Sequence, residues 1–249
     1  MIKIKNTIFS FYDFRKTKNI NNDYFLICDH GSNKIPNIYK NLGLNENILN
    51  THIAYDIGAR EVTIDIARKM FAQCFVSNFS RLIIDPNRKV IDDDLIVKNS
   101  FGINIPKNKN ISKKEKNLRI NKFYNKYHEG LNHILEKKYN NGIKLISIHS
   151  FTKETKTENR PTELGLLWNR NIPFMVSIKK KLLKMHVNVG NNKPYSGFFY
   201  NYTLDQHSKK FSNKSITIEI RNDLICNKKG IKRWSRLINE TFIKIRNEK

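Results

Sequence analysis

Short apolar runs that alternate with amphipathic stretches limit most strongly what this chain can fold into. The runs are rich in branched residues, as buried strands are, and they occupy residues 24–28, 81–85, 144–149 and 215–220. Other apolar residues recur at helical spacing, in four sets: Ala59, Val62, Ile66 and Met70; Tyr127, Leu131 and Ile134; Ile178, Leu182 and Met185; Trp234, Ile238 and Phe242. This alternation predicts an α/β fold, in which a mostly parallel or mixed sheet carries helices on its faces.

The chain reads as one domain. Its 249 residues contain no internal repeat and no long linker rich in Pro, Gly or Ser, so we expect a single domain over residues 1–249. No apolar run approaches the ~20 residues that span a bilayer, and the first residues lack the pattern of a secretory signal. Three widely spaced cysteines argue against a disulfide framework. We therefore expect a cytoplasmic protein that does not enter a membrane.

The chain is strongly basic, with 46 Lys and Arg against 22 Asp and Glu and a net charge of +24. Such a balance is typical of proteins that bind nucleic acid or an anionic membrane surface. Here the charge is scattered through a chain that is crowded with Asn and Ile, and Lys, Asn and Ile share A/T-rich codons. We therefore attribute the excess to base composition rather than to a nucleic-acid partner. Residues 106–116 form a basic run, which we expect to be a solvated loop.

Two predicted strands end in a histidine. His30 follows the run at residues 24–28, next to Asp29, and His149 ends the run at residues 144–149. Ligands of α/β folds bind at the carboxyl ends of strands, imidazole is a common zinc ligand, and a nearby carboxylate can orient its second nitrogen. The alternative is structural: Asn33 makes a turn after His30, and His149 forms a hydrogen bond inside a turn.

A carboxylate lies inside another apolar run, at Glu219. A buried carboxylate is costly unless it is paired or functional. Arg221 is two residues further on, hence on the same face of a strand, so that an ion pair between the two is one interpretation. The other interpretation is a general base beside a metal-bound water.

Arginines bracket the apolar run at residues 81–85. Guanidinium groups bind carboxylates in a bidentate manner, so Arg81 and Arg88 are candidates for holding an acidic substrate, although surface arginines are common. Asp56 precedes a predicted helix, where it is either a helix cap or a functional carboxylate. The sequence has no Gly-rich phosphate loop, no dinucleotide-binding fingerprint and no Cys-x-x-Cys pair, which argues against those chemistries.

Seven short motifs follow one another between residues 24 and 225, nearly the whole chain. They are Cys28-Asp29-His30-Gly31-Ser32-Asn33, His52-Ile53-Ala54-Tyr55-Asp56-Ile57-Gly58-Ala59, Ser80-Arg81-Leu82-Ile83-Ile84-Asp85-Pro86-Asn87-Arg88, Ile148-His149-Ser150-Phe151-Thr152, Arg160-Pro161-Thr162-Glu163-Leu164-Gly165, Asn192-Lys193-Pro194-Tyr195-Ser196 and Ile218-Glu219-Ile220-Arg221-Asn222-Asp223-Leu224. In this order they resemble the N-formylglutamate amidohydrolase family.

The resemblance implies a zinc-dependent hydrolase similar to zinc carboxypeptidases and aspartoacylases, with a three-layer α/β/α sandwich around a mixed, mostly parallel central sheet. By that similarity His30 and His149 correspond to metal ligands. The carboxypeptidase pattern has a Glu three residues after its first histidine, where this sequence has Asn33, so Asn33 and Asp56 are the alternatives for the third ligand. Glu219 lies where the late catalytic glutamate of the wider group falls.

The implied reaction is the zinc-dependent hydrolysis of an N-acylated acidic amino acid. N-formyl-L-glutamate is the first choice, with formate and L-glutamate as products. Arg81 and Arg88 would hold the carboxylates of this small anionic substrate, with Arg160 or Arg221 as alternatives. Two other functions remain open: the same fold acting on another N-acyl amino acid or a small peptide, and a metal-free basic protein that binds nucleic acid.

Overall fold

An eight-stranded mixed sheet forms the centre of the molecule. The computed structural model describes residues 2–15, 23–138, 142–155, 157–211 and 214–248, and the strand order is β1-β2-β4-β3-β7-β10-β8-β9. The strand bounds are Ile2–Lys5 (β1), Phe9–Asp13 (β2), Tyr24–Cys28 (β3), Gln73–Ser77 (β4), Lys144–Phe151 (β7), Leu164–Leu167 (β8), Val189–Asn191 (β9) and Lys214–Arg221 (β10). The four central strands β4, β3, β7 and β10 are parallel, whereas β2 pairs antiparallel with β4 and β8 pairs antiparallel with β10. The predicted α/β class with a mixed, mostly parallel sheet is confirmed.

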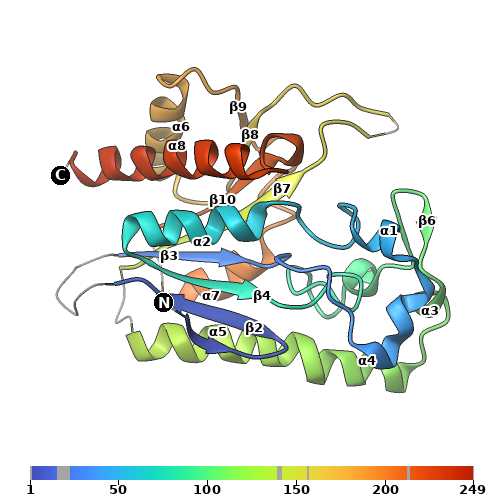
Figure 1. Cartoon of the computed structure of the whole chain (residues 1–249). Helices are drawn as coiled ribbons and strands as arrows, with labels where there is room; N and C mark the ends of the chain where they lie inside the picture. The colour runs from blue at the N-terminus through green and yellow to red at the C-terminus, as the bar shows by residue number, and fades with distance from the viewer. Residues whose placement is uncertain (1, 16–22, 139–141, 156, 212–213, 249) are drawn as a thin grey trace.

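Helices cover both faces of this sheet, which gives three layers (Figure 1). The helices α2 and α8 lie on one face, and α5 and α7 lie on the other. The helix bounds are Glu46–Leu49 (α1), Ala59–Met70 (α2), Pro106–Lys109 (α3), Lys113–Arg119 (α4), Lys126–Lys138 (α5), Ile172–Leu183 (α6), Tyr202–Phe211 (α7) and Lys228–Arg246 (α8). A small hairpin, β5 (Asn99–Ser100) and β6 (Ile103–Asn104), stands apart from the main sheet.

Strand β3 is apolar and buried along its whole length because both of its faces are covered. In β3, Tyr24, Leu26 and Cys28 belong to the core under α2 and α8, whereas Phe25 and Ile27 belong to the core on the α5 side. Successive side chains of a strand point to opposite faces, so each run of five apolar residues contributes to two cores. The parallel strands all end at the same edge of the sheet, and this edge carries the site described below.

The strand predicted at residues 81–85 is wrong. The chain turns there, with the Ile83 amide donating to the Ser80 carbonyl, and the strand next to β3 is β4 instead. Leu82, Ile83 and Ile84 are nevertheless fully buried, because this loop packs into the core on the α5 side. An apolar run predicts burial, and it becomes a strand only where a neighbouring strand can pair with it.

The basic run at residues 106–116 is not a loop. It contains α3 and the start of α4, where Ser112 caps the helix by accepting a hydrogen bond from the Glu115 amide at 3.1 Å. A Ser followed three residues later by Glu is typical of the start of a helix. The loop was predicted from the many lysines alone, without this pattern.

The remaining sequence expectations concern membranes and cysteines. Within the described ranges, no helix has the length and apolar character needed to cross a membrane. Cys28, Cys74 and Cys226 are free thiols, in agreement with the expected lack of a disulfide framework.

Candidate active site

Three neighbouring parallel strands bring the sequence-predicted histidines and glutamate together. His30 lies two residues beyond the end of β3, His149 lies within β7, and Glu219 lies within β10. Glu219 is directly opposite His149 in the β7–β10 register, and β3 is the other neighbour of β7. Residues that are about 190 positions apart in the sequence therefore meet at one sheet edge because the strands that carry them are hydrogen-bonded neighbours.

The centre of the site is a buried cluster of His30, Asp56 and His149. The Asp56 Oδ2 atom lies 2.9 Å from His149 Nδ1 and 3.4 Å from His30 Nδ1. One ligand atom from each of the three residues lies within 4.8 Å of the others, a spacing that one metal ion can bridge. His30 Nδ1 is buried and has no hydrogen-bond partner among the described residues, so this nitrogen is available as a ligand.

The second nitrogen of each histidine is held by another buried carboxylate. His30 Nε2 lies 2.7 Å from Asp85 Oδ1, and His149 Nε2 lies 3.1 Å from Asp29 Oδ2. Asp29 in turn accepts a hydrogen bond from the Tyr127 hydroxyl at 2.8 Å. Carboxylates in this position fix the orientation of metal-ligating histidines and leave the opposite nitrogen to face the metal.

The charges of the cluster favour a cation. Burial by itself raises the pKa of Asp56, but Arg81 and the two histidines outweigh it and hold the pKa well below its usual value. The pKa values of Asp29 and Asp85 are also lowered, mainly by the adjacent histidines, against the effect of burial. Burial lowers the pKa of His149, yet its hydrogen bonds to Asp29 and Asp56 hold that pKa well above the usual value. Ionised carboxylates this dense need positive charge between them, which a metal ion or protons on the imidazoles can supply.

Asp56 does not cap α2, as one sequence interpretation proposed. The N-cap of α2 is Gly58, at φ 78°, and the Asp56 side chain turns into the cluster instead. There it forms an ion pair with Arg81 and accepts a hydrogen bond from the Ser150 amide at 3.2 Å. The turn before α2 thus positions a carboxylate between the two histidines.

Glu219 faces the same site. Its side chain is buried, and its Oε2 atom has no hydrogen-bond partner among the described residues. Burial raises the pKa of Glu219 to about 7. The structural alternative, an ion pair with Arg221, is wrong, because Arg221 pairs with Asp223 at 2.8 Å.

A cavity of about 250 Å³ opens over the cluster. It is lined by His30, Asp56, His149 and Glu219, together with His52, Ile53, Arg81, Asp85, Asn87, Arg88, Val97, Ser100, Phe101, Ser150, Tyr195 and Tyr200. The cavity combines a candidate metal cluster, an unpaired carboxylate oxygen and two arginines.

The sequence that carries this cluster and cavity is similar to a known family. The family model of N-formylglutamate amidohydrolase matches residues 23–226. The chain belongs to this family.

Solved structures share the fold of this chain. A gene product from Agrobacterium tumefaciens is 26% identical, with a TM-score of 0.86 and coverage of 97% of both chains. The N-formylglutamate amidohydrolase from Ralstonia eutropha is 17% identical, with a TM-score of 0.69 and coverage of 96% of this chain and 97% of the other. No curated protein matches this sequence. Membership of an amidohydrolase family indicates a hydrolase, and the second structure supports the shared fold.

The four predicted substrate-binding arginines of this amidohydrolase-family chain do not all reach the cavity. Arg81 and Arg88 line it, and the buried Arg81 Nε has no partner among the described residues. Arg160 lies behind the wall and donates to the Tyr195 hydroxyl at 2.9 Å. Arg221 is turned away, in its pair with Asp223.

Asn33 does not join the histidines. Its side-chain amide donates to the Leu49 carbonyl at 3.2 Å and to the Asn50 side chain at 2.9 Å, and it lines a different cavity. The position three residues after His30 therefore belongs to a neighbouring turn, and the carboxylate of the cluster comes from Asp56.

Sequence reasoning missed several residues of the cavity wall. His52, Tyr195 and Tyr200 were within or beside recognised motifs, but nothing in their spacing marked them as part of a site. Asp85, the last residue of the run at residues 81–85, is the residue whose position could have indicated a partner for His30, since a carboxylate at the end of a buried segment needs a partner.

Proposed function

We propose that this chain is a zinc-dependent amidohydrolase that cleaves the amide of an N-acylated acidic amino acid. The first candidate reaction converts N-formyl-L-glutamate and water to formate and L-glutamate. The observation that carries the proposal is the placement of the unpartnered Glu219 Oε2 and His30 Nδ1 around one cavity, beside Asp56 and His149.

His30, Asp56 and His149 would hold the metal. Two imidazole nitrogens and one carboxylate are a donor set that zinc takes in catalytic sites, with a further position open to substrate or water. The unpartnered His30 Nδ1 and the excess of ionised carboxylates support this assignment. When bound, zinc supplies Lewis acidity, which makes water a nucleophile near pH 7 and polarises the amide carbonyl.

Glu219 would move the proton. As a carboxylate it accepts a proton from the attacking water, whose oxygen forms the new bond to the acyl carbon. It then donates this proton to the departing nitrogen as the C–N bond breaks, so that the amine leaves neutral and Glu219 is ionised again. Its oxygen without a hydrogen bond supports this role, because no protein group has to be displaced first.

Arg81 and Arg88 would bind the carboxylates of the substrate. Both line the cavity, and Arg81 keeps a buried N–H without an acceptor among the described residues. Two fixed guanidinium groups would orient a dicarboxylate so that its amide lies against Glu219.

Tyr195 would add a hydrogen-bond donor. Its hydroxyl accepts from Arg160 Nη1 at 2.9 Å, and the Arg160 guanidinium lies 5.0 Å from the ring centre. Because Arg160 can only donate, the phenolic proton remains for an acceptor in the cavity. The oxygen of the reacting amide is the acceptor that gains negative charge during hydrolysis. Arg160 would thus act as a positioning residue.

The test is formate release from N-formyl-L-glutamate by the zinc-loaded protein. We expect activity that a chelator removes and added zinc restores. Glu219→Gln should retain one zinc per chain, measured by elemental analysis, while kcat falls by about 10²–10⁴-fold. No release from folded, zinc-containing protein would overturn the substrate, and no zinc together with no release would overturn the metal-dependent hydrolase. Normal turnover in Glu219→Gln would remove Glu219 from the mechanism.

A further inference from the structure

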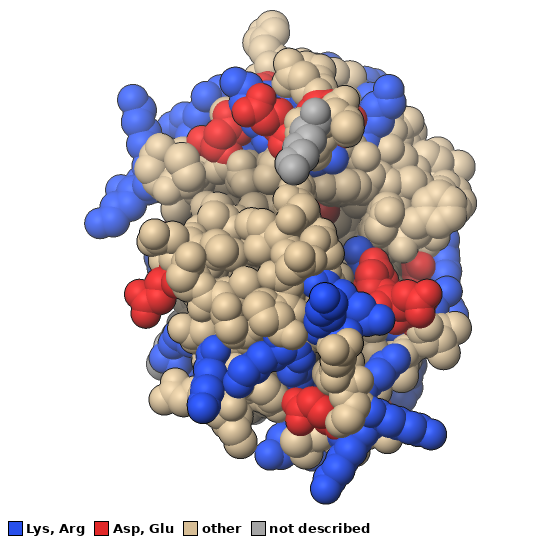
Figure 2. Space-filling model, turned by 90° about the vertical axis from the view of Figure 1, so that its right-hand side faces the viewer, with Lys and Arg blue, Asp and Glu red and all other residues tan. Residues whose placement is uncertain are grey.

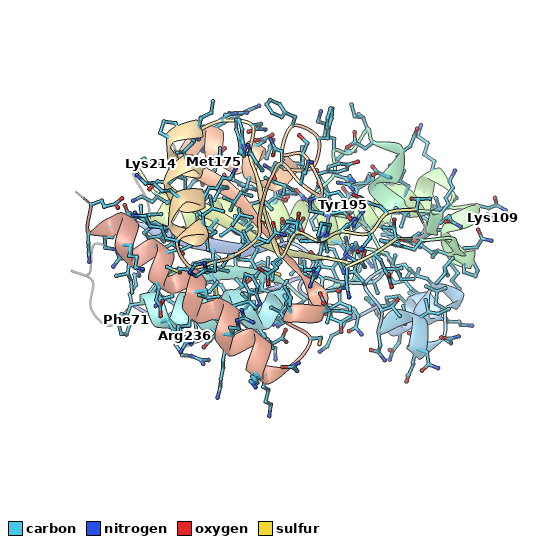
Figure 3. All side chains as sticks on the ribbon, turned by 90° about the horizontal axis from the view of Figure 1, so that it is seen from above. Phe71, Lys109, Met175, Tyr195, Lys214 and Arg236 are labelled. Atoms are coloured by element: carbon cyan, nitrogen blue, oxygen red, sulfur yellow. The ribbon has the colours of Figure 1, made fainter. Side chains whose placement is uncertain are left out.

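Exposed aromatic side chains are concentrated around the cavity. Within the described ranges, five aromatic side chains are at least 36% exposed: Phe71, Phe101, Phe198, Phe199 and Tyr200. Two of them, Phe101 and Tyr200, line the cavity, and Phe198 and Phe199 directly precede Tyr200. Phe71 lies at the end of α2, far from the cavity residue Tyr195 (Figure 3). We call Phe101, Phe199 and Tyr200 the aromatic rim.

The rim is built from two separate segments. Phe101 stands at the turn of the β5–β6 hairpin, with its ring centre 6.2 Å from that of His52. On the segment before α7, the ring centres of Phe199 and Tyr200 are 6.4 Å apart. The Arg88 guanidinium lies 5.0 Å from the Tyr200 ring centre, so the rim continues directly from a charged wall of the cavity.

The end of the molecule toward which the parallel strands run has few charged side chains across its middle (Figure 2). Figure 2 looks onto the end of the molecule toward which the parallel strands run in Figure 1, and a broad band without Lys, Arg, Asp or Glu crosses its middle. The chain has a net charge of +24, so a surface that only attracts anions would carry Lys and Arg at this end as well. The uncharged band indicates that this end also binds something other than an anionic group. Phe199 is 79% exposed, and such apolar exposure beside a cavity is typical of a binding surface.

N-formyl-L-glutamate gives the aromatic rim nothing to bind. Its acyl group is a single formyl unit, its side chain ends in a carboxylate, and its apolar part is two methylene groups. Charged groups inside the cavity suffice for such a molecule. The rim therefore fits a part of the substrate that a small dicarboxylate lacks.

We propose that the preferred substrate carries an aromatic or large apolar group next to the amide that is cleaved, and that this group packs on Phe101, Phe199 and Tyr200 outside the cavity. The substrate class is then an N-acyl amino acid with an apolar acyl chain, or an N-acyl acidic residue followed by an apolar residue. This inference rests on the proposed amidohydrolase function and names the substrate class of the same site.

The test uses pairs of substrates that differ by one phenyl ring. N-phenylacetyl-L-glutamate against N-acetyl-L-glutamate places the ring on the acyl side, and N-formyl-L-glutamyl-L-phenylalanine against N-formyl-L-glutamylglycine places it on the carboxyl side. In at least one pair we expect the ring to raise kcat/KM by about ten-fold, as the packing of one ring on aromatic side chains predicts. The pair that responds identifies which side of the amide faces the rim.

Variants assign the gain to the aromatic rim. Phe199→Ala and Phe101→Ala should each remove most of the ring-dependent gain. Phe199→Ala, which does not line the cavity, should also leave kcat/KM for N-formyl-L-glutamate within about two-fold. Phe71→Ala, which shortens an exposed aromatic at the other end of α2, should keep the gain. No gain in either pair, or a gain that survives in both rim variants, would overturn the inference.

Two further outcomes have a defined meaning. If no substrate of the set is hydrolysed, the proposed function fails, and calorimetric binding of the same ring pairs to wild type and Phe199→Ala decides on the aromatic rim alone. Ring-dependent binding that Phe199→Ala removes would support the rim, and equal binding within each pair would overturn it. If the wild type sediments as a dimer and Phe199→Ala as a monomer, the rim is a contact between copies, which also overturns the inference.

Discussion

Asp29 and Asp85 show how single residues outside the cluster of His30, Asp56 and His149 set its geometry. Each holds one histidine by the nitrogen that points away from Asp56, at 3.1 Å for Asp29 and 2.7 Å for Asp85. Both carboxylates are buried, and each is itself held by a further donor: Asp29 by the Tyr127 hydroxyl and Asp85 by the Asn87 amide. Loss of either partner frees an imidazole to rotate and lowers its basicity.

We predict that Asp29→Asn lowers zinc affinity by about 10–100-fold, because His149 loses the carboxylate that orients it. Competition with a chelator of known affinity measures this change, and circular dichroism checks that the variant is folded. Asp65→Asn, on the exposed side of α2, should bind zinc as the wild type does. Equal affinity in Asp29→Asn would show that Asp29 has no part in metal binding.

The Tyr195 hydroxyl is a second group whose contribution a single substitution can measure. We predict that Tyr195→Phe lowers kcat by about 10²-fold with little change in KM, since the phenol would act on the oxygen that becomes charged only during the reaction. Steady-state kinetics of formate release separate the two constants. Tyr12→Phe, whose hydroxyl lies near Arg60 and away from the cavity, is the matched control. A raised KM at unchanged kcat would instead assign Tyr195 to substrate binding.

At this scale the sequence predicted those candidates that stand within or just after an apolar run. His30, His149 and Glu219 follow from apolar runs interrupted by reactive side chains, and the sheet brings them together. Asp56 was open between a cap and a ligand, because the loop before α2 has no period that fixes its side-chain direction. Arg221 shares a strand with Glu219, but its side chain reaches forward to Asp223, which strand alternation alone does not predict.

The start of α2 shows what an element contributes to the site. Gly58 is at φ 78°, and a Cβ atom there would lie 2.2 Å from the Ile225 carbonyl oxygen. The same turn carries Asp56 two residues earlier, so the close approach of the α2 N-terminus to the segment after β10 fixes where this carboxylate lies. The sequence does not predict the close approach at Gly58 or the position of the Asp56 carboxylate, because both depend on a contact with a segment far along the chain.

Gly58→Ala should therefore destabilise the protein by about 2–4 kcal/mol, from the unfavourable φ and the clash together. Gly142→Ala is the control, because Gly142 is also at positive φ, 91°, but nothing lies within 4 Å of its Cβ position. We expect that control to cost about 1 kcal/mol. Urea unfolding of both variants gives the two values, and equal losses would mean that the backbone yields at Gly58.

The contact between α5 and α7 contains two stacked histidines. His128 Nδ1 lies 3.1 Å from His207 Nε2, and His128 Nε2 lies 3.0 Å from the Pro86 carbonyl oxygen. With His128 donating to Pro86 and His207 donating to His128, both rings are neutral. Burial lowers the pKa of His128 to about 4 and that of His207 to about 3.

This pair predicts a loss of stability between pH 6.5 and pH 5. The unfolded chain protonates these histidines below about pH 6.5, and the folded chain does not, so acidification favours unfolding. His52, whose pKa burial lowers to about 3, adds to this loss. The raised pKa values of His30, His149 and Glu219 oppose it, because the folded chain holds these protons more tightly than the unfolded chain, and the aspartates respond only at lower pH. Urea unfolding at both pH values, with excess chelator, measures the loss. It should be smaller in a His128→Asn/His207→Asn variant than in wild type or His133→Asn, and an equal loss in all three would exclude the pair as its source.

For the whole molecule, the alternation of apolar runs and amphipathic stretches predicted the layers and the strands β3, β7 and β10. It predicted a strand at residues 81–85 and missed β4. The apolar pattern of residues 81–85 predicts only that they are buried. The segment that joins the sheet is β4, because it can pair with both β2 and β3. The outer strands β1 and β9 are short and less apolar, so their place follows from the neighbours they pair with. Periodicity thus predicts the interior of this fold better than its edges.

The net charge of +24 is also a property of the whole chain. On the face in Figure 2, Lys and Arg are spread above and below the uncharged band, with Asp and Glu among them. We therefore predict only non-specific DNA binding, which weakens by orders of magnitude between 50 and 200 mM salt, the range over which phosphate contacts are lost. Fluorescence anisotropy with two unrelated duplexes measures it, and the two should bind equally. Sequence-dependent binding that persists at 200 mM salt would contradict a compositional origin of the charge and restore nucleic acid as a partner.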